Sequence, residues 1–209
     1  YGFFKITEGE SSGLWSVLRS SEDEVLKGSL LITLYENLRW KTISPQGFRE
    51  EMLAYLPNES NSLLFSMALS YLGDCQRIFP SDSRPLEQVL WKIVTTNPVS
   101  QHRLQAFRLY RSIADSEEAV QRLYTLWQER KAPKDCALSE SDYIGLSYIL
   151  AIHLPEKADK IIATQLSRIQ NPDRKKEYQF ISPSVSPRKA ERDSVFASLL
   201  IAGNRRVEP

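Results

Sequence analysis

The chain has 209 residues, 42% of them hydrophobic and 25% charged, so it can bury a sizeable core and is too apolar to be disordered. Its 27 basic and 26 acidic residues leave a net charge of +1, which argues against a general polyanion binder and so against nucleic acid as a partner. No apolar stretch approaches the ~20 residues that cross a bilayer, so we expect no membrane span. No targeting segment is recognisable, and cytoplasm and periplasm both stay open as compartments.

Helix is the secondary structure that the chain favours throughout. Glycine is scarce, with 8 residues in all, and no segment predicts a strand. After the short stretch 1–7, the segment Ser21–Glu24 has the pattern of a capping box, and leucines at helical spacing follow it. Further apolar faces of period 3.6 recur along the chain and predict a series of amphipathic helices.

Helix starts are punctuated by a Ser or Asn followed by proline. This pattern predicts a polar N-cap with proline in the first turn, where its missing N–H costs nothing. It occurs at Ser44-Pro45, Asn97-Pro98, Asn171-Pro172 and Ser186-Pro187. Ser139 predicts one further start, with Asp142 placed to complete a capping box.

The predicted helices recur in pairs. First helices are expected from Ser21, Asn58, Asn97 and Ser139, and second helices near Pro45, Pro85, Ser116 and Pro155. A two-helix unit of roughly 40 residues is the length of a HEAT or armadillo repeat. We therefore predict an all-α fold, an α-α superhelix of HEAT/armadillo-like helical hairpins, with a compact helical bundle as the alternative. The Trp-Leu-Gly pattern and shorter period of tetratricopeptide repeats are absent.

The residues of a catalytic centre are missing. His102 and His153 lie in separate predicted helices, and neither has the partner one turn away that a zinc-binding helix needs. There is no glycine-rich phosphate loop and no G-x-S-x-G elbow. Cys75 and Cys136 are interpreted as buried thiols, with a disulfide as the alternative. The sequence predicts no catalytic residue, no metal ligand and no cofactor within this chain.

The last quarter of the chain has a specific string of residues. It contains Asn171-Pro172-Asp173-Arg174, Tyr178, Phe180-Ile181-Ser182-Pro183, Ser186, Arg192-Asp193 and Asn204-Arg205-Arg206-Val207-Glu208. This string resembles the C-terminal helical domain of the aminopeptidase N-type zinc metallopeptidases, the gluzincin aminopeptidases, and of their bacterial members in particular. The opening Tyr1-Gly2-Phe3-Phe4 is similar to the end of the β-domain that precedes the helical domain in that family.

The resemblance implies that residues 1–7 are a remnant of that β-domain or a linker, and that 8–209 form a C-terminal α-superhelical domain truncated at its own C-terminus. It implies that the parent enzyme removes N-terminal amino acids from peptides with one zinc ion held in its catalytic domain. This fragment would be inactive by itself. The implied partners are the catalytic and β domains of the same polypeptide and the peptide substrate. The candidate substrate-binding residues, on this basis, are Arg174, Arg192, Arg205 and Arg206.

A second interpretation rests on the repeat spacing alone. In that interpretation the chain is a free-standing HEAT-like scaffold, which binds a protein partner along its groove. Substrate preference, oligomeric state and any contact between the basic residues and substrate are not specified by the sequence.

Overall fold

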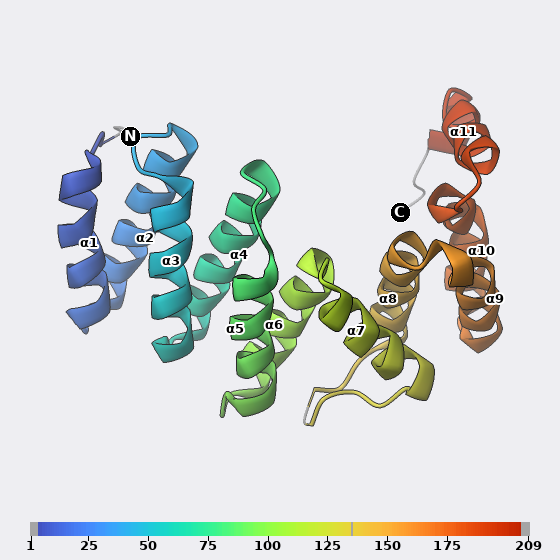
Figure 1. Cartoon of the computed structure of the whole chain (residues 1–209), viewed down its shortest axis with the longest axis horizontal. Helices are drawn as coiled ribbons and strands as arrows, with labels where there is room; N and C mark the ends of the chain where they lie inside the picture. The colour runs from blue at the N-terminus through green and yellow to red at the C-terminus, as the bar shows by residue number, and fades with distance from the viewer. Residues whose placement is uncertain (1–3, 135, 206–209) are drawn as a thin grey trace. The chain divides into compact units, whose positions relative to one another are not determined.

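A computed structural model describes residues 4–134 and 136–205, and within them the chain forms eleven α-helices, four 3₁₀ turns and no strand (Figure 1). The predicted all-α fold built of helical hairpins is confirmed. No helix among the described residues is both long enough and apolar enough to span a membrane. The chain divides into two compact units: unit 1 contains residues 1–114 and 133–136, and unit 2 contains 115–132 and 137–209.

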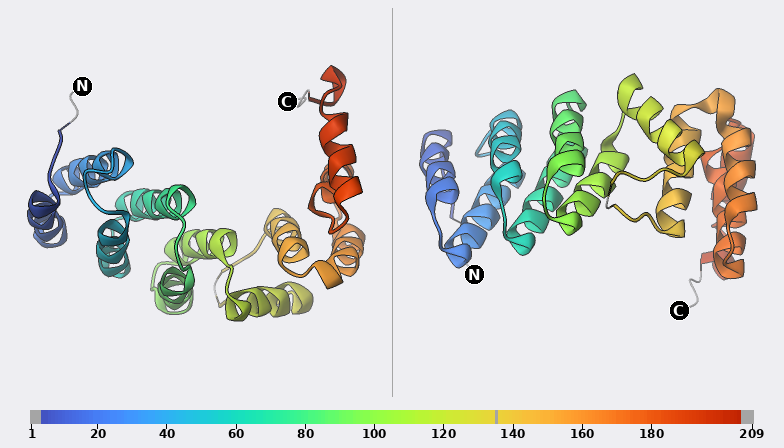
Figure 2. Two further views of the ribbon diagram at one scale, coloured as in Figure 1. Left: turned by 45° about the horizontal axis from the view of Figure 1, so that its top comes forward. Right: turned by 90° about the horizontal axis from the view of Figure 1, so that it is seen from below.

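Unit 1 consists of three helical hairpins. Its elements are α1 (Glu8–Ser20), α2 (Glu24–Arg39), α3 (Pro45–Tyr55), a 3₁₀ turn (Leu56–Asn58), α4 (Ser62–Ile78), α5 (Arg84–Thr96) and α6 (Ser100–Ile113). Helix α1 packs on α2, α3 on α4, and α5 on α6. Helix α4 also packs on α2 and on α6, and these three helices form one layer. Helices α1, α3 and α5 form the other layer (Figure 2).

The observed pairing of the helices differs from the pairing predicted from the sequence. The helix from Glu8 to Ser20 was not predicted, so the pairs expected from Ser21 and Pro45, and from Asn58 and Pro85, are each shifted by one helix. A capping box begins this helix: the Thr7 hydroxyl accepts from the Glu10 N–H, and the Glu10 carboxylate accepts from the Thr7 N–H. The pattern Thr-x-x-Glu was the feature that could have revealed it.

Several predicted N-caps are displaced by a few residues. Asp23, not Ser21, caps α2, and Asn61, not Asn58, caps α4. Asn97 accepts from the Val99 N–H, so the chain turns there before α6 begins at Ser100. Ser186 likewise accepts from the Arg188 N–H, and α11 begins at Lys189. In both wrong cases the Asn or Ser side chain stabilises a local turn that competes with a cap.

Other predicted caps are confirmed. Ser44 caps α3 with Pro45 in its first turn, and Asn171 caps α10 with Pro172 in the same position. Ser139 and Asp142 form the expected reciprocal capping box of α8.

The core of unit 1 lies between its two helix layers. Leu34, Phe65 and Phe107 come from the α2–α4–α6 layer and are fully buried, and Phe48 and Met52 of α3 meet them from the other layer. Each side chain of this size contributes about 1.5–3 kcal/mol on burial. A hairpin alone would leave half of this apolar surface in water, so the hairpins depend on one another.

Asn37 connects the N-terminal segment to α2. Its side chain is completely buried and makes four hydrogen bonds. The amide nitrogen donates to the carbonyls of Phe4 (2.8 Å) and Thr33 (2.9 Å). The amide oxygen accepts from the Ile6 N–H (3.0 Å) and the Thr42 hydroxyl (2.6 Å). All four hydrogen-bonding positions of the Asn37 amide are used. These bonds hold residues 4–7 beside α2, although this segment has no regular secondary structure of its own.

Unit 2 begins with α7 (Glu117–Glu129) and the antiparallel pair of α8 (Glu140–His153) and α9, with a 3₁₀ turn between them. The remaining bounds are Pro155–Lys157 for that turn, α9 (Ala158–Arg168), α10 (Pro172–Ile181), a 3₁₀ turn (Ser182–Val185), α11 (Lys189–Ser198) and a last 3₁₀ turn (Ala202–Arg205). Trp127 of α7 donates its indole N–H to the buried Gln165 of α9 at 2.8 Å. Tyr178 of α10 is buried and its hydroxyl lies 2.9 Å from that of Ser147 on α8.

Replacement of Asn37 by alanine should lower the free energy of unfolding by about 2–3 kcal/mol, because the substitution removes four hydrogen bonds and leaves the partly buried Ile6 N–H without its acceptor. Chemical denaturation measures this loss. Asn58→Ala is the matched control, since the exposed Asn58 makes one bond, to the Ala54 carbonyl (3.0 Å). Its expected effect is below about 0.5 kcal/mol, and equal losses in the two variants would refute the role given to Asn37.

Substitution of two glycines of unit 1 by alanine should change the stability of the fold in opposite directions. Gly13 lies inside α1, and an added Cβ there would have no neighbouring atom within 4 Å, so Gly13→Ala should stabilise by about 0.5–1 kcal/mol. At Gly47 a Cβ would lie 2.9 Å from the Ser44 hydroxyl that caps α3, so Gly47→Ala should destabilise. Thermal unfolding of both variants checks the signs, and a shift in the same direction would contradict the prediction.

Candidate functional site

Arg174, the first of the candidate arginines, lies in the first turn of α10. Its guanidinium is 3.3 Å from the Glu140 carboxylate at the start of α8. Glu140 also accepts from the Gln170 N–H at 2.8 Å. That backbone bond first, and Arg174 to a smaller degree, hold the pKa of Glu140 below its usual range. The described contacts of Arg174 thus fix the start of α10 against α8.

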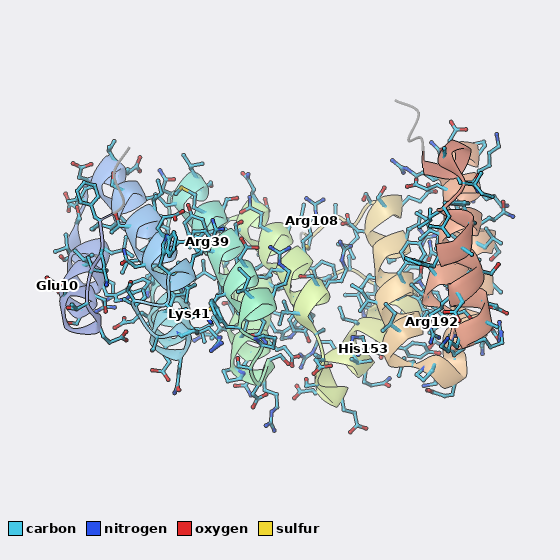
Figure 3. All side chains as sticks on the ribbon, turned by 90° about the horizontal axis from the view of Figure 1, so that it is seen from above. Glu10, Arg39, Lys41, Arg108, His153 and Arg192 are labelled. Carbon is cyan, nitrogen blue, oxygen red and sulfur yellow. The ribbon has the colours of Figure 1, made fainter. Side chains whose placement is uncertain are left out.

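Arg192 of α11 binds backbone within its own segment. One guanidinium nitrogen donates to the carbonyls of Ser186 (2.6 Å) and Pro187 (2.9 Å). The side chain also lines a cavity of about 300 Å³, together with Ile152 of α8 and Pro155 of the turn that follows. Figure 3 labels Arg192 among the side chains of unit 2. Arg192 therefore holds the turn before α11 in place and is the one candidate that the structure sets at a cavity among the described side chains.

The four candidate arginines do not form one described site. Arg174 contacts the first residue of α8, whereas the Arg192 cavity lies at the other end of that helix, and a helix of 14 residues spans roughly 20 Å. Arg205 is the last residue of the final 3₁₀ turn, and its side chain lies outside the described atoms. Arg206 lies outside the described residues. Substrate binding by any of the four stays a prediction.

Arg188 is a residue of this region that the sequence analysis did not single out. Its guanidinium makes two hydrogen bonds to the Asp159 carboxylate of α9, at 2.8 and 2.9 Å, and further bonds to Glu191. The pKa of both carboxyls is lowered by these bonds. Because α11 has no buried residue, the polar contacts of Arg188 and Arg192 carry much of its attachment.

The largest hollow among the described cavities lies in unit 1, between α4 and α6. This groove has a volume of about 640 Å³. Leu69, Leu109 and Ile113 form its apolar floor. Hydroxyl, amide and charged groups form the rest of the lining: Ser66, Ser70, Asp74, Gln76, Arg77, Gln105, Arg108 and Ser112. The two helices come close at Gly73, where a Cβ would lie 2.9 Å from a methyl of Leu109.

One edge of the groove is fixed by a tyrosine pair. Tyr35 of α2 stacks on Tyr71 of α4 with ring centroids 4.0 Å apart, and its hydroxyl donates to the Asp74 carboxylate at 2.8 Å. Arg77 donates to the same carboxylate at 2.6 Å. Burial, and then Asp74, raise the pKa of Tyr35 to about 12, so the phenol stays protonated and keeps donating at neutral pH.

Histidine, cysteine and carboxylate side chains are among the groups that can carry catalysis. No cluster of three or more His, Cys, Asp or Glu side chains that could hold a metal occurs in the part of the chain that the structure describes. His102 and His153 lie in different units. Cys75 and Cys136 are buried as thiols and not joined as a disulfide. Burial raises the pKa of the Cys75 thiol, which disfavours the nucleophilic thiolate.

Comparisons of the chain with protein-family models, curated proteins and solved structures found no match.

The contacts of Arg192 lead to a test of its structural role. In Arg192→Ala the carbonyls of Ser186 and Pro187 lose their donor, so amides of the turn and of α11 should exchange hydrogen faster while global unfolding changes little. Hydrogen–deuterium exchange with mass spectrometry measures both. Lys176→Ala, at an exposed position of α10, is the control and should leave exchange unchanged. Unaltered protection of α11 in Arg192→Ala would contradict the structural role.

Proposed function

We propose that this chain is the non-catalytic, C-terminal helical domain of a zinc aminopeptidase, where it closes the substrate chamber and contributes to peptide access and binding. The parent enzyme would remove N-terminal amino acids from peptides. The observation that carries the proposal is the residue string from Asn171 to Glu208, which resembles the corresponding segment of the gluzincin aminopeptidases. The helical-hairpin fold agrees with what that resemblance implies.

The positions of the string residues add support of a second kind. Asn171 caps α10, Tyr178 is buried against Ser147, and Arg192 binds the backbone of the turn before α11. Residues with such roles fix how α10 and α11 are placed in unit 2. The string therefore reflects the fold of this region, and the proposed function follows from the family that has this fold.

The groove between α4 and α6 suits the proposed contact with peptides. An apolar floor accommodates side chains, and the hydroxyl and amide groups of its rim can bond a peptide backbone. The proposal places no zinc in this chain, and the described residues hold no group of three or more His, Cys, Asp or Glu side chains that could bind a metal. The metal would belong to the parent's catalytic domain.

The reading frame upstream of Tyr1 gives the first test. It should encode a His-Glu-x-x-His helix with a distal glutamate, and a frame without this motif would refute the proposal. The second test is activity. The full-length product with zinc should release the N-terminal residue of an aminoacyl reporter, whereas this chain alone with zinc should not. Cleavage by the isolated chain would overturn its non-catalytic assignment.

A groove variant tests the role in substrate access. Ser70→Arg in the full-length enzyme places a long cation in the groove, so the KM for peptides of about eight or more residues should rise several-fold while turnover of a single-residue reporter stays unchanged. Ser12→Arg, on the exposed face of α1, is the control. Equal kinetics of both variants on long peptides would remove the groove from the proposal.

The alternative function is a free-standing protein-interaction scaffold, and the same groove is the observation that favours it. A gene without a peptidase domain, together with a stoichiometric protein partner whose binding Ser70→Arg abolishes, would favour the scaffold over the aminopeptidase domain.

A further inference from the structure

His102 forms a buried contact between the second and third hairpins of unit 1. It lies in the first turn of α6 with no exposed surface. Its ring stacks flat on Phe65 of α4, with centroids 4.0 Å apart and planes 6° apart. The Nε2 atom lies 3.0 Å from the Ser62 hydroxyl, also on α4. The Nδ1 atom is buried and has no hydrogen-bond partner.

The surroundings suit a neutral imidazole. When Nε2–H donates to the Ser62 hydroxyl, Nδ1 carries no proton, and its burial costs only the loss of its contact with water. A cation would carry a second N–H at Nδ1 and find no acceptor there, which is the costlier state for a buried group. The N-terminal end of α6, three residues away, also opposes a positive charge.

One charged group acts in the opposite sense. The buried carboxylate of Glu59, before α4, favours the cation. Glu59 is already bound by Lys27 of α2, by the Tyr55 hydroxyl of α3 and by the Asn61 N–H at 2.7 Å. The buried carboxylate of α5, Glu87, accepts from Ser83 within its own segment at 2.8 Å. Burial outweighs Glu59, so the pKa of His102 lies below its ordinary value of 6.5.

The sign of the pH effect follows. The unfolded chain takes up the proton near pH 6.5, before the folded chain does, so the stability from the neutral contact is complete above that pH and is lost as pH falls below it. Burial alone would raise the pKa of Glu59, but its bonds from Lys27, Tyr55 and Asn61 bring it below 4.5. Glu59 therefore stays ionised between pH 7.5 and 5, and the proton that the unfolded chain takes up at His102 is the one that changes stability in this range.

We propose that His102 is a pH-sensitive latch that holds α6 against α4 at neutral pH and releases the α5–α6 hairpin on mild acidification. The latch lies on the same two helices that form the 640 Å³ groove, which begins one helical turn further along α6 at Gln105. Release of α6 therefore opens that groove. The latch needs no aminopeptidase, and its test is independent of the parent enzyme's activity.

Hydrogen–deuterium exchange at pH 7.5 and 5.0, corrected for the intrinsic pH dependence of exchange, tests the latch. In the wild-type chain we expect the amides of α5 and α6 to lose protection on the order of tenfold at pH 5.0, and those of α1 and α2 much less. His102→Gln keeps a polar side chain without titration and should abolish the pH response. Equal protection of α5–α6 at the two pH values, or an unchanged response in His102→Gln, would overturn the proposal.

The second histidine supplies a matched control. His153 is partly exposed at the end of α8 in unit 2, 3.9 Å from the Asp115 carboxylate, so His153→Gln should keep the wild-type response. The same variant leaves His102 as the one imidazole, whose NMR titration can be read directly without a substitution in unit 1. Titration below pH 6.5 supports the latch, and titration at or above 6.5 refutes it, even if His102→Gln fails to fold.

Discussion

A buried carboxylate, Glu59, joins the parts of unit 1. It is 3% exposed and lies between the end of α3 and the start of α4, where Lys27 of α2 and Tyr55 of α3 both bind it. A charge in this position needs its partners in place, because leaving a buried carboxylate unpaired costs about 3–5 kcal/mol, a large part of the stability of a typical domain. The three helices are therefore held in one arrangement, and the apolar layers pack around it.

The same constraint explains which parts of the fold the sequence could predict. Apolar periodicity depends on each helix alone, so α2 to α9 were expected close to where they lie, as were the caps at Ser44, Ser139 and Asn171. Pairing depends on contacts between helices. A period of about 40 residues is the same whichever helix begins the repeat, so overlooking α1 shifted the pairs in unit 1. In unit 2 the expected pair, α8 and α9, was right because α7 stands outside the pairs and so restores the predicted order.

The candidate sites were less predictable for a related reason. Arg174 and Arg192 could be named from the residue string. The string does not show that Arg174 contacts Glu140 at the start of α8, or that Arg192 binds two backbone carbonyls near the other end of that helix. The α4–α6 groove could not be inferred, because its floor combines Leu69 with Leu109 from another hairpin. The burial of His102 could not be predicted either, since its neighbours Gln101 and Arg103 are polar, as around a surface histidine. The side chain is buried because α4 packs over it.

The two units differ in where they place their polar contacts, and this difference bears on how each can move. In unit 1 the decisive groups, Asn37, Glu59 and His102, are buried, so salt screens their contacts much less than it screens exposed pairs, and a change of protonation or the loss of a partner alters them. In the C-terminal part of unit 2, Arg188 and its partner Asp159 are exposed, so solvent and salt screen their attraction. Salt should therefore weaken the attachment of α11 more than the packing of unit 1, whereas a change of pH should act on unit 1 through His102.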